Sequence, residues 1–133
     1  MPTRYQQLRQ SISNLAASPD AQLAHLESIF PNYGSPLPSG FNTDELGLDF
    51  GDIYCAVGHM LEFGEITQAE IDAAKPLDAL LERLSGKANA DFWTCEALLE
   101  DPRWVHVRRC ASEALAAYPD EVRESDWTRE HVT

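Results

Sequence analysis

Residues 41–72, FNTDELGLDFGDIYCAVGHMLEFGEITQAEID, decide the fold that this sequence predicts. Asn42 and Glu45 have the spacing of a capping box, which predicts a long helix that begins at Thr43. Gly64 is expected to end that helix, because glycine readily takes the left-handed conformation that follows a last turn. Apolar residues recur every three or four positions and indicate one buried side; they are Leu46, Phe50, Ile53, Tyr54, Val57, Met60 and Leu61.

The opposite side of this helix is acidic. From Thr43 to Ala74 there are eight Asp or Glu residues and neither Lys nor Arg, and Phe63 is an apolar residue on that polar side. Acids on a rigid helix beside exposed aromatic residues are typical of a surface that binds a basic protein. The predicted partner-binding residues are Asp44, Glu45, Asp49, Asp52, His59, Glu62, Phe63 and Glu65. The alternative is that Phe63 packs inside, against the loop at 31–40 or the C-terminal segment.

A third side of the same helix carries Gly47, Gly51 and Gly58. Each glycine inside a helix is destabilising by about 0.5–1 kcal/mol relative to alanine. Three of them together predict that another helix, or the backbone of a partner, approaches closely there. If the helix instead begins after Gly47, only two belong to it.

The rest of the chain also predicts helices, because no run of alternating apolar and polar residues is long enough for a strand. The expected elements are helices at 3–17, from Pro19 to Phe30, at 43–63 and 68–84, from Asn89 or Asp91 to Leu99, and from Pro102 to Tyr118. Pro76 is expected to kink or divide the helix at 68–84. Residues 31–40 form a loop and 119–133 a loosely held tail. The fold class is therefore all-α, a compact bundle of about six helices in antiparallel pairs.

Length and charge restrict the function. A chain of 133 residues suits one domain over 1–133. Its 22 acidic and 10 basic residues give a formal net charge of -12, which repels phosphate backbones and anionic lipids. We therefore expect no direct binding to nucleic acid or to a membrane, and a partner with a basic surface.

The N-terminal stretch and the cysteines predict a cytoplasmic protein. Residues 1–15 have no uninterrupted apolar segment of the kind found in signal peptides. Cys55, Cys95 and Cys110 are odd in number and include no C-x-x-C pair, which favours reduced thiols.

No common catalytic or nucleotide-binding motif occurs in the sequence. Two sets of residues have a spacing that would allow metal binding on one side of a helix: Cys55, His59 and Glu62, or Asp49, Asp52 and His59. A solvated polar surface with an incidental histidine explains them equally simply and is favoured. We expect no enzyme activity, no cofactor and no metal ion.

Residues 91–118, DFWTCEALLEDPRWVHVRRCASEALAAY, contain the pattern W-T-x-x-x-L followed by W-x-x-[VI]-R-x-x-A-x-x-x-L. The pattern resembles the closing helices of small bacterial immunity proteins, which protect cells against toxins of contact-dependent inhibition or type VI secretion. Its positions here are Trp93, Thr94, Leu98, Trp104, Val107, Arg108, Ala111 and Leu115. The resemblance implies that the two tryptophans anchor consecutive helices and that Arg108 pairs with an acid.

The same resemblance implies a cytoplasmic, non-enzymatic protein that binds one cognate toxin domain and occludes its active site. Many such toxins are nucleases with a basic cleft, which the acidic helix would match. The leading hypothesis is therefore an immunity protein that neutralises a toxin. The alternatives are a small acidic adaptor or regulatory module that binds another basic or helical partner, and a metal-dependent enzyme.

Overall fold

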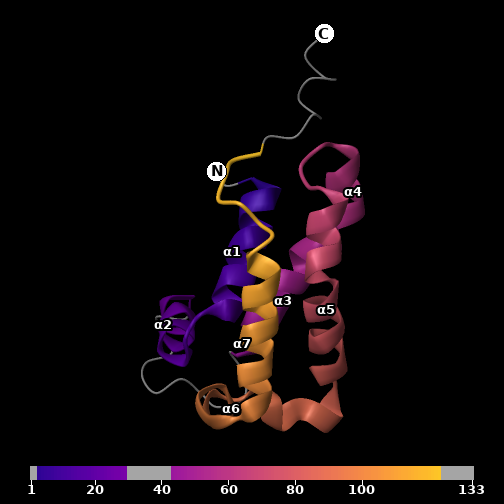
Figure 1. Ribbon diagram of the computed structural model, residues 1–133. Helices are drawn as coiled ribbons and strands as arrows, with labels where there is room; N and C mark the ends of the chain where they lie inside the picture. The colour runs from indigo at the N-terminus through magenta and orange to yellow at the C-terminus, as the bar shows by residue number, and fades with distance from the viewer. Residues whose placement is uncertain (1–2, 30–42, 124–133) are drawn as a thin grey trace.

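The computed structural model describes residues 3–29 and 43–123, and within these ranges every regular element is a helix (Figure 1). The elements are α1 (Arg4–Ala16), α2 (Pro19–Ile29), α3 (Asp44–Tyr54), α4 (Val57–Glu62), α5 (Gln68–Leu84), the 3-10 helix η2 (Lys87–Trp93), α6 (Cys95–Glu100) and α7 (Pro102–Leu115). The predicted all-α class is confirmed. The described ranges contain eight helices where the sequence predicts about six, for reasons given below.

Helix α7 is the centre of the bundle. It packs against α1 and α5 and runs antiparallel to both, while α3 packs against α1 and α5 (Figure 1). Apolar residues recur every three or four positions in α1 and in α7, so each helix has one apolar stripe. The two stripes pack against each other. The fully buried residues of these two stripes are Tyr5, Leu8, Ile12, Leu15, Trp104, Val107 and Ala111.

The helix starts follow the local signals in the sequence. Thr67 Oγ1 accepts a hydrogen bond from the Glu70 N–H at 3.2 Å, and Glu70 Oε1 accepts one from the Thr67 N–H at 2.9 Å, which confirms the capping box of α5. The Asp101 carboxylate accepts from the Arg103 N–H at 2.8 Å and caps α7, with Pro102 at its first position. Pro76 does not divide α5, which continues to Leu84.

The long helix predicted from Thr43 to Phe63 is divided. Helix α3 ends at Tyr54, and α4 begins at Val57 after Ala56, whose φ and ψ are -96° and 3°. The Ala56 N–H bonds to Ile53 O at 3.0 Å, a tight turn that redirects the chain. The predicted sides are therefore not continuous, and Leu61, predicted to be buried, is 40 % exposed.

Helix α3 begins within one residue of the predicted start at Thr43. The helix begins at Asp44, and Thr43 has a helical backbone conformation without any side-chain cap. The Thr43 hydroxyl is buried and has no hydrogen-bond partner among the residues that the structure describes. Asn42, the predicted cap, lies outside the described residues, as does the predicted loop at 31–40.

The single helix predicted from Asn89 or Asp91 to Leu99 is two elements. Asn89 has non-helical φ and ψ of -114° and 20° inside η2. Thr94 then caps α6, because its hydroxyl accepts the Ala97 N–H at 3.0 Å. The prediction missed this cap, which sits between two stretches that both look helical.

The described part of the predicted tail is tied to the bundle. The Tyr5 hydroxyl donates to Pro119 O at 2.6 Å, and Arg123 Nη2 donates to Glu70 Oε2 at 2.7 Å. The Arg123 guanidinium also lies 4.0 Å from the centre of the Tyr5 ring. Residues 124–133 lie outside the described part of the chain.

Cys55, Cys95 and Cys110 are free thiols. Over residues 3–29 and 43–123, none of the helices is both long enough and apolar enough to cross a membrane.

Candidate functional site

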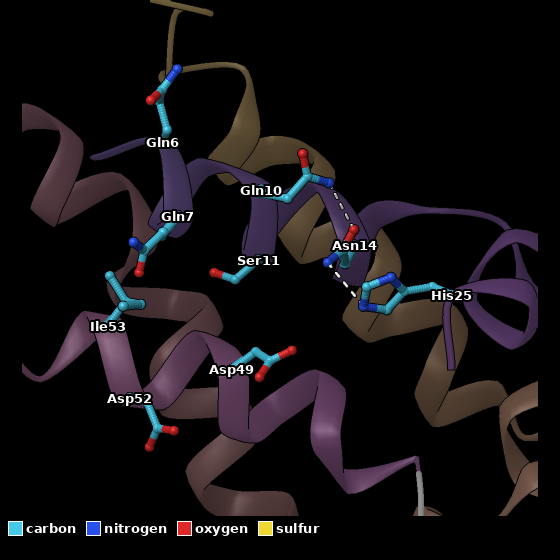
Figure 2. A pocket seen from close by; sticks show the side chains of 9 residues that line it. All are labelled: Gln6, Gln7, Gln10, Ser11, Asn14, His25, Asp49, Asp52 and Ile53. Carbon is cyan, nitrogen blue, oxygen red and sulfur yellow. Dashed lines mark hydrogen bonds between the residues drawn. The ribbon is translucent and has the colours of Figure 1, made fainter. Parts of the chain in front are cut away.

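A groove of about 650 Å³ lies between α1 and α3 (Figure 2). Helix α1 lines it with amides and a hydroxyl, α3 lines it with carboxylates, and α2 contributes one imidazole. The lining residues are Gln6, Gln7, Gln10, Ser11, Asn14, His25, Asp49, Asp52 and Ile53. None of these lining residues is Lys or Arg.

The acidic wall exists because α3 is amphipathic. Leu46 and Phe50 are each only 1 % exposed and turn one side of α3 into the core. Asp49 and Asp52 are three positions apart and lie together on another side. Figure 2 shows the Asp49 carboxylate extending into the space beneath α1, whereas the Asp52 carboxylate points away from α1.

Hydrogen bonds hold part of the opposite wall in place. Gln10 Nε2 donates to Asn14 Oδ1 at 2.9 Å, and Asn14 Nδ2 lies 3.4 Å from His25 Nε2 (Figure 2). The Ser11 hydroxyl donates to Leu8 O at 2.7 Å. A wall whose side chains are already ordered loses less conformational entropy when a ligand binds.

The carboxylates of α3 repel one another. Partial burial raises the pKa of Glu45, and the neighbouring charges of Asp49, Asp44 and Asp52 raise it further. None of these four acids forms an ion pair with any residue in the described ranges. The surface of α3 therefore carries negative charge that the described part of the bundle leaves uncompensated.

The predicted contact residues beyond α3 lie in different settings. His59 and Glu62 are exposed on α4, and the His59 ring meets the half-buried Phe63 ring edge-on, with ring centres 4.7 Å apart. His59 Nδ1 also lies 3.0 Å from Arg4 Nη1. The structure therefore separates the predicted surface into an α3 part and an α4 part.

Glu65 does not belong to an exposed surface, contrary to the sequence interpretation. It is 2 % exposed and accepts a hydrogen bond from Arg4 Nε at 2.9 Å. Gly64, with φ of 71°, ends α4 and turns the chain inward, and the Glu65 N–H bonds to Met60 O at 2.9 Å. The charge of Glu65 is neutralised inside the bundle.

Neither of the two metal sets that the spacing allowed is assembled. Within the described ranges, no three His, Cys, Asp or Glu side chains are grouped closely enough to hold a metal ion. The Cys55 thiol is exposed and lies 3.1 Å from the backbone oxygen of Asp52, at the break between α3 and α4. That break separates Cys55 and Asp52 from His59.

The glycine side of α3 contacts a side chain rather than a helix. A Cβ added to Gly47 would lie 3.0 Å from the Trp93 ring, whereas one added to Gly51 or Gly58 would meet nothing within 4 Å. The predicted close approach occurs at Gly47, and its neighbour is an indole. At the other two positions the described part of the fold leaves open space.

Trp93 and Trp104 anchor consecutive elements, as the resemblance implied. Trp93 Nε1 donates to Leu84 O and Trp104 Nε1 donates to Phe92 O, each at 2.9 Å. The Trp104 ring stacks on Phe92 with ring centres 4.5 Å apart. These contacts fasten η2 to the end of α5 and to α7.

Among residues 3–29 and 43–123, no acid pairs with Arg108, contrary to the implication of the resemblance. Its Nε donates to Gln22 Oε1 at 2.9 Å, and its Nη2 donates to Leu98 O. Gln22 in turn donates to the Asn14 and Leu15 carbonyls at the end of α1. These bonds make Arg108 a structural link between α2, α6 and α7. Burial lowers the pKa of Arg108.

The amides of α1 were missed as site residues. Their signal in the sequence is a polar side on an amphipathic helix, which most surface helices also show. Only the pairing of α1 with α3 makes these amides part of a groove.

In comparisons with known proteins, no family matches the chain, and neither a curated protein nor a solved structure is significantly similar to it.

Proposed function

We propose that this protein is a non-catalytic binding protein that neutralises a cognate bacterial toxin domain through the groove between α1 and α3. The observation that carries the proposal is a groove that Asp49 and Asp52 line from α3 and amides line from α1. Neither lysine nor arginine lines this groove. The resemblance of residues 91–118 to immunity proteins supports the toxin as the class of partner.

The groove suits arginine and lysine side chains of a partner. A guanidinium donates several hydrogen bonds from a planar fork, and both carboxylate and amide oxygens accept them. Asp49 supplies the charge, and Gln6, Gln7 and Gln10 line the facing wall. A groove of about 650 Å³ has room for more than one such side chain.

The repulsion among the α3 acids favours a basic partner. Asp44, Asp49 and Asp52 raise the pKa of Glu45 after the larger effect of burial, so the free protein contains unfavourable like-charge interactions. A cationic partner would relieve them on binding. The formal net charge of -12 would also accelerate the encounter with a basic cleft such as that of a nuclease.

Co-expression tests the proposal. The gene that lies beside this one is expressed alone and together with this protein, and cell survival is measured. We expect a toxic product whose lethality this protein suppresses. Co-purification of the two chains from the same cells tests whether suppression occurs by binding.

Charge-reversal variants connect that result to the groove. Asp49→Lys with Asp52→Lys is expected to abolish protection at low expression levels, because two attractive contacts become repulsive. Glu100→Lys with Glu113→Lys is the matched control, since both acids are exposed and line neither this groove nor the one described below. Equal protection by both double variants would rule out the α1–α3 groove as the contact surface. A neighbouring product without toxicity would contradict the neutralising role.

A further inference from the structure

A second groove, of about 630 Å³, lies between α3, the second half of α5 and η2. It shares no lining residue with the α1–α3 groove, so α3 is a wall common to two separate grooves. Its lining residues are Asp44, Gly47, Leu48, Phe50, Gly51, Asp78, Leu81, Glu82, Ser85, Gly86, Lys87, Ala90 and Trp93. We refer to it as the α3–α5 groove.

The α3–α5 groove presents apolar surface to solvent. Leu48 is 52 % exposed at its edge, and Trp93 is half-buried, with its indole N–H satisfied by Leu84 O. Leu81 and Phe50 lie deeper and are buried. Exposed apolar residues lining a hollow, with polar residues around them, are typical of a protein-binding surface.

Gly51 lies in this groove without a reason inside the described fold. A Cβ at this position would meet nothing within 4 Å, so no described neighbour requires glycine there. A glycine inside a helix is destabilising relative to alanine. The absent side chain does, however, leave room for a side chain of a partner to approach α3 closely.

The rim of the groove is acidic. Asp44, Asp78 and Glu82 line it, with Lys87 as the only lysine or arginine among the lining residues. Burial and the neighbouring charge of Glu82 raise the pKa of Asp78, so two rim acids repel each other. This charge opposes a second copy of an acidic chain and complements a cationic segment.

We propose that the α3–α5 groove docks a basic amphipathic helix of a partner protein. An aliphatic or aromatic side chain of that helix enters over Gly51 and contacts Leu81 and Trp93. Lysine or arginine side chains on either side of it pair with Asp78 and Glu82. The surface is independent of the α1–α3 groove and does not require the partner to be a toxin.

The test uses synthetic peptides and the full chain. A helical peptide with a leucine stripe and a lysine-rich polar side is titrated into the ¹⁵N-labelled protein. The first comparison peptide has glutamate in place of lysine, and the second has the same composition with the leucines scrambled. We expect saturable chemical-shift changes of the Leu48, Gly51 and Ala90 amides and of the Trp93 indole. Only the lysine-rich peptide with the intact leucine stripe should cause them.

Two pairs of variants separate docking from general charge attraction. Gly51→Leu blocks the groove and is expected to weaken binding about tenfold, whereas Gly58→Leu fills an equally open glycine position outside it. Asp78→Asn with Glu82→Gln is expected to weaken binding by a similar factor, and Glu100→Gln with Glu113→Gln removes the same charge elsewhere. Circular dichroism checks that each variant remains helical.

The proposal is overturned by equal affinity of Gly51→Leu and Gly58→Leu, by equal binding of the scrambled peptide, or by shifts confined to Gln10, Asn14 and Asp49. Absence of saturable binding overturns it too. A dimer of the free protein that Gly51→Leu dissociates would identify a second copy as the occupant and contradict it. None of these results bears on toxin neutralisation, which the α1–α3 variants test.

Discussion

Glu45 lies within the acidic cluster of α3, and its pKa is raised first by burial and then by Asp49, Asp44 and Asp52. A carboxyl whose pKa is higher in the folded than in the unfolded state favours folding at pH values below its ordinary pKa. This contribution is lost as the pH rises through the pKa of the folded state, and the charged carboxyl then opposes folding. Glu45 is therefore destabilising at neutral pH.

Neutralising this residue should stabilise the free protein. We expect Glu45→Gln to raise the free energy of unfolding at pH 7 by about 0.3–0.5 kcal/mol, the size of one like-charge pair on a helix. The gain should disappear below about pH 4, where both proteins carry a neutral side chain. Urea unfolding at the two pH values measures it. A loss of stability at pH 7, or a gain independent of pH, would contradict the account.

Arg108 illustrates a different use of charge at the residue scale. Its guanidinium bonds to Gln22 Oε1 and Leu98 O, and Gln22 is itself 1 % exposed. Arg108→Lys keeps the charge but cannot make both bonds with the same geometry. We expect the free energy of unfolding to fall by about 1–3 kcal/mol, because buried acceptors lose their partner. Arg109→Lys, at the exposed neighbouring position, should change it little; equal effects would refute the structural link.

At the scale of elements, α3 separates two grooves and carries glycines in two different environments. The Gly47 position faces the Trp93 ring, which is fixed by its bond to Leu84 O and by edge contacts with Phe92 and Trp104. The Gly51 and Gly58 positions are open. Replacing glycine by alanine should therefore change the free energy of unfolding in one direction at Gly47 and in the opposite direction at Gly51 and Gly58.

Gly51→Ala and Gly58→Ala should each raise the free energy of unfolding by about 0.5–1 kcal/mol, the difference in helix propensity. Gly47→Ala should lower it by about 1 kcal/mol, because the added methyl group overpacks against the fixed indole. Thermal unfolding of the three variants measures the difference. A stabilised Gly47→Ala protein would contradict the described contact with Trp93.

The elements that the sequence predicts well are those with a complete local signal. Capping residues and apolar periodicity define α5 and α7 without tertiary information. The break at Ala56 has no proline or glycine to mark it, so periodicity alone predicts a continuous helix. Glu65 was misplaced because the turn at Gly64 redirects the chain into the core. Of the residues that line the candidate site, only Asp49 and Asp52 were predicted. Its amide wall depends on how α1 packs, which no local pattern contains.

At the scale of the whole molecule, several arginines serve the fold. Arg4 pairs with Glu65. Arg103 pairs with Asp91 and Asp101, and Arg123 pairs with Glu70 and Glu121. The acids of α3 have no such partner within the described ranges. The formal net charge of -12 favours the approach of a cationic partner.

The pair of Arg123 with Glu70 closes the bundle and should govern its acid stability. Burial alone would raise the pKa of Glu70, but hydrogen bonds from Arg123 and the Thr67 N–H lower it overall. A carboxyl whose pKa is lowered by folding stabilises the folded state at pH values above its ordinary pKa. This contribution is lost as the pH falls through the pKa of the folded state. Glu70→Gln should therefore be less stable than the parent at pH 7 by about 2 kcal/mol, with the difference shrinking below about pH 4. A difference that persists at acid pH would contradict the ion pair.

The central claim is that a basic partner is recognised by the carboxylates of the α1–α3 groove. The rate of association between the purified protein and its co-purified partner, measured over a range of ionic strengths, tests it most directly. We predict that Asp49→Asn with Asp52→Asn lowers kon at low salt and flattens its salt dependence, while Glu100→Gln with Glu113→Gln has a smaller effect on both. Identical rates and salt dependence for the two double variants would contradict the account.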